Sequence, residues 1–140
     1  MFIKKIAFFA ILISLLWVSD SLAEIKEGLW KITTKTEIKN APVQIPATTV
    51  KQCITKNNPV PQPTAKDYVC ETKHTEIKGD TVTYLIECTG KNSAMLILGE
   101  TIYKGNSFNG TSTATVKNFG QPDVQINNII SGRHIGPCKK

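Results

Sequence analysis

The sequence predicts an all-β fold: a single small antiparallel meander of about seven strands, forming a curved sheet or a small barrel. Short runs rich in threonine, valine and isoleucine are separated by glycine, asparagine and proline, which is the pattern of strands and turns. Several runs alternate apolar and polar residues with a period of two, and none has the period of an amphipathic helix. Strong curvature or closure would protect the strand edges of a threonine-rich chain.

The first two strands are expected on either side of a break at residues 40–42. Alternate positions of the run GLWKITTKTEIKN share one face, which we expect to be buried: Trp30, Ile32, Thr34 and Thr36. In the next run, VQIPATTVKQCI, Pro46 restricts the first half to an edge or a bulge. Recurring prolines then predict a proline-rich loop over residues 55–67.

Two hairpins are expected further along the chain. The run YVCETKHTEIKGDTVTYLIECTG has Gly79-Asp80 between two strand-like halves, and a Gly-Asp pair in that place is a hairpin signal. The following run repeats the design with Gly105-Asn106 at its turn, and DVQINNIISGRH predicts the last strand. One face of the second arm of the first hairpin carries Val82, Tyr84, Ile86 and Cys88.

Residues 1–23 have the three-part pattern of a secretory signal peptide. A basic start is followed by the apolar run Ile6–Val18 and by small residues at Ser21–Ala23, where cleavage is expected. The apolar run is shorter than the roughly 20 residues that a membrane-spanning helix needs. We therefore expect residues 24–140 to form a single exported domain, with no transmembrane segment after cleavage.

The charge of the chain does not indicate a nucleic-acid partner. It has 17 lysines and arginines against 11 acidic residues, for a net charge of +6. The lysines are scattered, and the single arginine, Arg133, leaves no interleaving of arginine with aromatic residues of the kind that base-stacking surfaces use. We expect a solvated basic surface that faces an anionic cell envelope.

Four cysteines in an exported chain predict two disulfide bonds: Cys53, Cys70, Cys88 and Cys138. No two of them form the Cys-x-x-Cys pair that a zinc site or a redox motif requires, so we expect no metal site.

The residues leave the disulfide pairing open. We slightly favour Cys53 with Cys70, which would close the proline-rich loop at its base and leave Cys88 for Cys138. Alternatively, a three-residue loop at residues 78–80 would bring Cys70 opposite Cys88 and leave Cys53 for Cys138. A two-residue Gly79-Asp80 turn would shift the register and spoil that opposition.

Catalytic motifs are missing from the sequence. His134 lies four residues before Cys138, but this pair cannot act as base and nucleophile if the cysteine is oxidised, because only a thiolate attacks. His74 is expected at a partly exposed strand position. The chain has no Gly-x-Ser-x-Gly, phosphate loop or His-Glu-x-x-His motif. We expect no enzymatic activity, no catalytic residues and no cofactor.

Five segments carry a resemblance to a known family: EGLWKITTKTEI, TVKQCIT, GDTVTYLIECTG, IYKGNSFNGT and SGRHIGPCK. In this order and spacing, with all four cysteines, the chain resembles a family of small exported bacterial proteins, the domain of unknown function family 3617 (DUF3617). The resemblance covers nearly all of residues 24–140 and implies export to a Gram-negative periplasm. It implies no known activity. Members often carry methionine-rich strands, whereas this chain uses mostly threonine, isoleucine and valine.

Together these observations predict a monomeric periplasmic protein that acts as a non-enzymatic binding module for a small or lipid-like ligand. Trp30 and Tyr84 are the residues expected to face that ligand. The alternative is a cell-envelope protein-interaction module that uses a strand edge or the proline-rich loop 55–67. A fully packed interior would argue against the first function, and a closed barrel would weaken the version based on edge pairing.

Overall fold

The computed structural model describes residues 25–139, which form seven β-strands, as the sequence predicts. The predicted signal peptide, residues 1–23, lies outside this range. In chain order the strands are β1 (Gly28–Ile38), β2 (Thr48–Ile54), β3 (Val69–Lys78), β4 (Thr81–Thr89), β5 (Ser93–Lys104), β6 (Ser107–Asn118) and β7 (Val124–Gly136). The same residues contain no helix long and apolar enough to cross a membrane.

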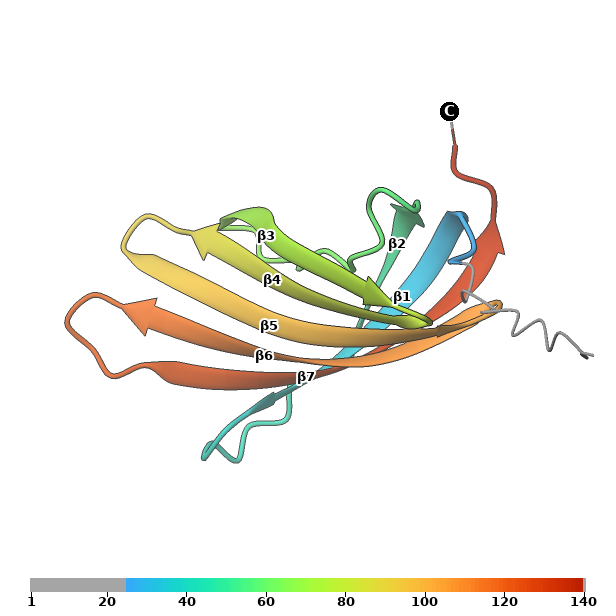
Figure 1. The fold of residues 1–140 in the computed structure, drawn as a ribbon. Helices are drawn as coiled ribbons and strands as arrows, with labels where there is room; N and C mark the ends of the chain where they lie inside the picture. Colours follow the sequence, from blue (N-terminus) through green and yellow to red (C-terminus); the bar gives the residue numbers. More distant parts are fainter. Residues whose placement is uncertain (1–24, 140) are drawn as a thin grey trace, which may run out of the picture.

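All seven strands belong to one antiparallel sheet in the order β2-β1-β7-β6-β5-β4-β3. Consecutive strands are neighbours, as in a meander, except β2 and β3, which form the two edges of the sheet. The first strand pairs instead with the last, over most of the length of β1. Figure 1 shows the result, a sheet curled into a half-barrel that stays open between β2 and β3.

The tight turns fall where the glycine pairs predict them. The β3–β4 turn is Gly79-Asp80 and the β5–β6 turn is Gly105-Asn106, each of two residues. Both glycines have a φ of 60°, a left-handed conformation that residues with a side chain adopt only at a cost. A glycine at the first of two turn residues matches the twist of the flanking strands.

The concave face of the half-barrel holds the core. As the alternation predicts, Trp30 and Ile32 on β1 and the Val82 to Cys88 set on β4 point inward and are buried. One end of this face is filled by an aromatic cluster, in which the ring of Trp30 lies 5.7 Å from Tyr103 and 5.4 Å from Phe108. Such edge-on and tilted ring pairs add stability beyond the area they bury.

Candidate functional site

A cavity of about 250 Å³ lies in the other half of the concave face, beneath residues 61–65 of the β2–β3 loop. Six strands contribute to its walls. The apolar wall residues are Ile32, Val50, Tyr84, Ile86, Met95, Ile97, Ala114, Ile126 and Ile130. None of the described lining residues carries a formal charge. An apolar cavity of about 150 Å³ is enough for benzene, so this one has room for about ten non-hydrogen atoms.

The side chain of Gln52 holds the loop over the concave face. Its Nε2 donates a hydrogen bond to the carbonyl oxygen of Val60 (3.0 Å), and its Oε1 accepts one from the backbone N–H of Gln62 (2.9 Å). On the far side, Nε2 of Gln62 lies 3.5 Å from Oγ1 of Thr72 on β3. The loop therefore spans the opening between the two edge strands.

A second anchor of the loop is Tyr103. Its hydroxyl donates to the carbonyl oxygen of Pro59, and the adjacent Val60 is buried in the core. Burial raises the pKa of Tyr103, and nearby Tyr84 raises it further. The hydroxyl therefore stays protonated, and able to donate, well above neutral pH.

Three polar side chains form a hydrogen-bonded row on the cavity wall. Thr36 donates from Oγ1 to Oδ1 of Asn128 (2.9 Å), and Nδ2 of Asn128 donates to Oγ of Ser112 (3.2 Å). An amide has two N–H donors and two acceptor lone pairs, so this row leaves one of each on Asn128 for another group. We call Thr36, Asn128 and Ser112 the polar row.

Tyr84 lines the same cavity. Its ring covers Gly99, the residue paired with it on β5, and a β-carbon at that position would overlap the ring. Burial raises the pKa of Tyr84, while the neighbouring hydroxyl groups of Thr101 and Ser112 act in the opposite direction. The phenol is therefore a neutral polar group at physiological pH.

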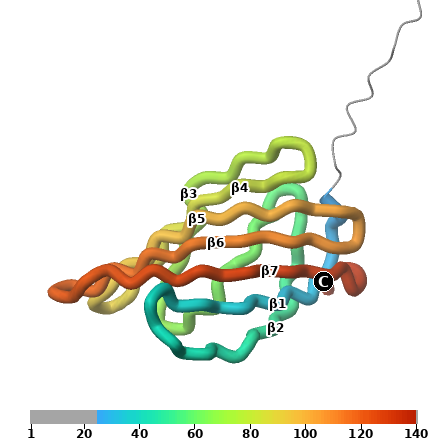
Figure 2. The backbone as a smooth tube through the Cα atoms, turned by 90° about the horizontal axis from the view of Figure 1, so that it is seen from below, coloured from blue at the N-terminus to red at the C-terminus, as the bar shows by residue number. Residues whose placement is uncertain are grey.

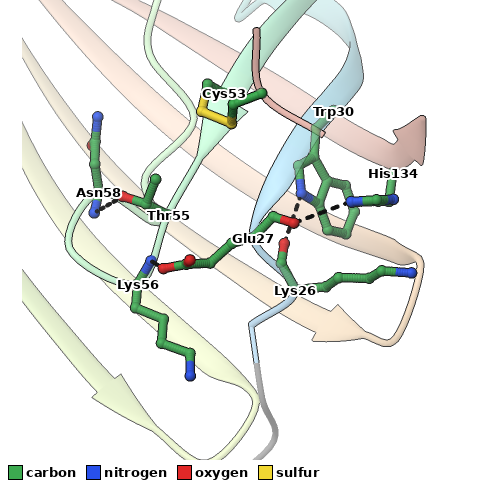
Figure 3. The surroundings of a disulfide bond; sticks show 9 residues. Lys26, Glu27, Trp30, Cys53, Thr55, Lys56, Asn58 and His134 are labelled. Carbon is green, nitrogen blue, oxygen red and sulfur yellow. Dashed lines mark hydrogen bonds between the residues drawn. A yellow bond between two sulfur atoms is a disulfide. The ribbon is translucent and has the colours of Figure 1, made fainter. Parts of the chain in front are cut away.

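Trp30, by contrast, does not line the cavity, which corrects the expectation that it faces a ligand. Its side chain is fully buried in the aromatic cluster, and its Nε1 donates to the carbonyl oxygen of Lys26 (3.0 Å; Figure 3). The alternating pattern identified its face correctly. It could not show that one half of that face is packed with rings and the other half is hollow.

His134 and Cys138 do not form a thiol site. The imidazole packs edge-on against Trp30, and its Nε2 lies 3.2 Å from the carbonyl oxygen of Glu27, as Figure 3 shows. Cys138 is bonded to Cys53 and therefore has no free thiolate. His134 thus holds in place the segment that leads into β1.

The structure overturns the favoured disulfide pairing, Cys53 with Cys70 and Cys88 with Cys138. It instead joins Cys70 to Cys88 and Cys53 to Cys138, the alternative that the sequence left open. Described residues include no free cysteine.

A β-bulge explains the Cys70–Cys88 bond. The β3–β4 turn has two residues, which alone would put the two cysteines out of register. However, the pairing shifts by one position between Thr72 and His74, so that Lys73 is an extra residue on β3. This shift brings Cys70 directly opposite Cys88. Bulges of this kind are local and are not visible in an alternating pattern.

The second disulfide fastens the C-terminal tail across the sheet. Leu29 on β1 lies between Cys53 on one side and Gly136 on the other. After Gly136 the chain must therefore cross the start of β1 to bring Cys138 to Cys53, where the Cα atoms are 5.4 Å apart.

In the part of the chain that the structure describes, no cluster of three His, Cys, Asp or Glu side chains is arranged to hold a metal ion. His74 is exposed on β3, among charged side chains.

The comparison with known families bears on nearly all of the described residues. A family model described as a protein of unknown function (DUF3617) matches residues 25–138. The chain belongs to the DUF3617 family. The resemblance seen in the five segments is thereby confirmed. No curated protein and no solved structure matched this DUF3617 chain.

The structure brings together residues of this DUF3617 protein that the sequence did not single out. Asn128 lies between Ile126 and Ile130 on the face of β7 that lines the cavity. A polar residue among the apolar residues of this face is the sequence signal that could have identified it. Gln52 holds a similar place on β2. Its partners are backbone atoms of the loop, and no pattern of residue types predicts these.

Proposed function

We propose that this DUF3617 protein is exported to the periplasm and acts there as a non-enzymatic binding module for a small neutral or lipid-like molecule. The observation that carries the proposal is the cavity of about 250 Å³ with apolar walls and no formally charged lining residue among those described. Burial of apolar ligand surface against such walls is favourable, whereas a buried charge would have no partner.

The polar row supports a ligand with one uncharged polar group. Asn128 retains a donor and an acceptor, so it can bind a hydroxyl or an amide while the apolar remainder contacts Ile97 and Ile126. A small number of placed polar groups in an apolar pocket is the usual arrangement for ligand orientation.

The lining also supports binding without catalysis. The described lining residues include no histidine, carboxylate, lysine or cysteine, which are the usual groups for acid-base and nucleophilic catalysis. Tyr84 has a raised pKa and is therefore a weaker acid than an exposed tyrosine.

Titration with 1-octanol, which has nine non-hydrogen atoms and a hydroxyl, tests the proposal through amide chemical shifts in an NMR experiment. We expect saturable shifts at residues around the cavity. Ala114→Leu should fill the cavity and weaken binding at least tenfold, since Ala114 is buried and lines it. Thr113→Leu, on the exposed face of the same strand, is the matched control and should bind as wild type does.

Thermal unfolding of both variants would establish that they are folded. The proposal fails if wild type shows no saturable binding of 1-octanol and no small molecule accompanies the native periplasmic protein in non-denaturing mass spectrometry. Sequencing the N-terminus of that sample tests export separately, with a mature chain beginning at Glu24 as the expected result.

The alternative, an interaction module, has support from one feature: the sheet is open, so β3 has no neighbour beyond β4. Two other features weaken it. The bulge at Lys73 and the charged side chains along β3 hinder strand addition. The proline-rich loop is held by Gln52 and Tyr103 and is not free to bind a partner. A stoichiometric protein partner in the same mass spectra would favour this alternative.

A further inference from the structure

Three connections lie at the same end of the half-barrel. The backbone N–H of Lys39 in the β1–β2 loop donates to Gln125 O (3.1 Å), and that of Phe119 in the β6–β7 turn donates to Asn92 O of the β4–β5 turn (3.4 Å). In Figure 2 these connections lie on the left, away from the C-terminus. We call residues 39–47, 89–93 and 117–124 the turn rim.

The turn rim exposes apolar side chains at its tips. Phe119 is 78% exposed and Val43 is 58% exposed, and both lie in connections and not on a strand face. Val69 begins β3 next to Thr89 of the rim and is 80% exposed. Transfer of a side chain as large as phenylalanine out of water is strongly favourable, so these tips are suited to enter an apolar environment.

The same rim is basic. Lys39, Lys91 and Lys117 are all exposed, and Asp123 is the only acidic residue within it. Lys39 Nζ lies 3.5 Å from the neutral side-chain oxygen of Gln125. Within residues 25–139, none of these lysines pairs with a carboxylate. Their charges are therefore available to an anionic partner.

We propose that the turn rim docks on an anionic lipid bilayer, with Phe119 and Val43 in the interfacial region and the three lysines against lipid phosphates. Two separate apolar tips and three exposed lysines, spread over three connections at the same end of the half-barrel, fit a fluid surface better than a flat protein patch. Peripheral proteins bind bilayers through this combination of buried apolar area and attraction to anionic lipids.

The position of the cavity adds to this argument. Thr36 and Asn128 of the polar row lie just inside the Ile38–Ile126 pair, which is the last pair of β1 and β7 before the rim. A bilayer at the turn rim would therefore face the half of the sheet that holds the cavity. The docking surface does not depend on the cavity being occupied, and Ala114→Leu should leave docking unchanged.

Co-sedimentation of the purified periplasmic protein with vesicles tests the proposal. We expect binding to vesicles of phosphatidylglycerol and phosphatidylethanolamine that weakens with added salt, and little binding to phosphatidylcholine alone. Phe119→Ser should lower the partition coefficient roughly tenfold, and Lys39→Gln or Lys117→Gln about fivefold each.

Matched controls come from the opposite end of the half-barrel. Ile77→Ser removes an exposed apolar side chain from β3, and Lys104→Gln removes an exposed charge beside the β5–β6 turn. Both should bind vesicles as wild type does. The proposal is overturned if anionic vesicles do not bind the protein, or if Phe119→Ser binds them equally well. A dimer in sedimentation equilibrium that Phe119→Ser dissolves, without vesicle binding, would overturn it in favour of a second copy of the chain.

Discussion

The ring of Tyr84 lies across the backbone of Gly99, its partner on the neighbouring strand. The ring of Phe108 covers Gly132 in the same way two strand pairs further along the sheet, between β6 and β7. In both places the missing β-carbon makes room for an aromatic ring on the concave face. Aromatic residues thus replace the packing that a glycine in a strand cannot supply.

We expect Gly99→Ala to destabilise the protein, because a β-carbon there would overlap the Tyr84 ring. Overpacking of this kind costs roughly 1–3 kcal/mol in the free energy of unfolding, measurable by urea denaturation. In a Tyr84→Val background the same substitution should cost less, since the ring is gone. Equal costs in the two backgrounds would contradict the proposed contact.

The two disulfides should contribute unequally to stability. The Cys53–Cys138 bond closes 85 residues and the Cys70–Cys88 bond closes 18. On the chain-entropy account, removing the disulfide that closes the longer loop, by Cys53→Ser with Cys138→Ser, should cost about 1.4 kcal/mol more than removing the one that closes the shorter loop. Urea denaturation of the two double variants measures this difference, and non-reducing peptide mapping of wild type checks the pairing itself.

The buried tyrosines should make the protein lose stability in alkali. The pKa of Tyr103 is raised in the folded state by burial, so the folded protein keeps a proton that the unfolded chain releases near pH 10. Stability is therefore fully present below about pH 10 and falls above it, by up to about 1.4 kcal/mol per pH unit for each such tyrosine.

Tyr103→Phe isolates this contribution. The variant loses the hydrogen bond to Pro59 and should be about 1 kcal/mol less stable at neutral pH. Above pH 10 its stability should decline less steeply than that of wild type, because one titrating group has been removed. Urea denaturation between about pH 9 and pH 11 measures this, because an unfolded tyrosine titrates with a pKa of about 10. If the free energy of unfolding falls equally steeply with pH in both proteins, Tyr103 is not the titrating group.

Trp30 gives a direct optical test of the packed half of the core. It is the only tryptophan among the described residues, and its side chain is fully buried. We expect blue-shifted emission that acrylamide quenches only weakly in the folded protein and strongly after unfolding. Saturating 1-octanol should leave quenching unchanged, since Trp30 does not line the cavity. Ready quenching in the native state would show that this half is open.

The fold could be predicted from the sequence because its determinants are local. Alternation placed Trp30 and the Val82 to Cys88 set on the inner face, and the glycine pairs placed the tight turns. Each of these signals depends on neighbouring residues. The number of strands and the curved meander follow from them.

The parts that could not be predicted depend on residues far apart in the chain. The extra residue at Lys73 changes which cysteines meet, and the pairing of β1 with β7 places Cys138 near Cys53. The cavity arises because Pro61 and its neighbours rest on the sheet without filling one half of it. No local pattern specifies how well two distant surfaces fit together, so Tyr84 and Trp30 were indistinguishable from sequence.

The place of β1 between β2 and β7 also has a consequence for the order in which we expect the sheet to assemble. A chain that emerges from its N-terminus presents β1 and β2 first, yet β1 lacks its second neighbour until β7 is available. The β3–β4 hairpin needs no such delay, and its cysteines can be oxidised as soon as they meet. We therefore expect β1 to be completed only when β7 pairs with it, and the Cys53–Cys138 bond to form in its native setting after that pairing.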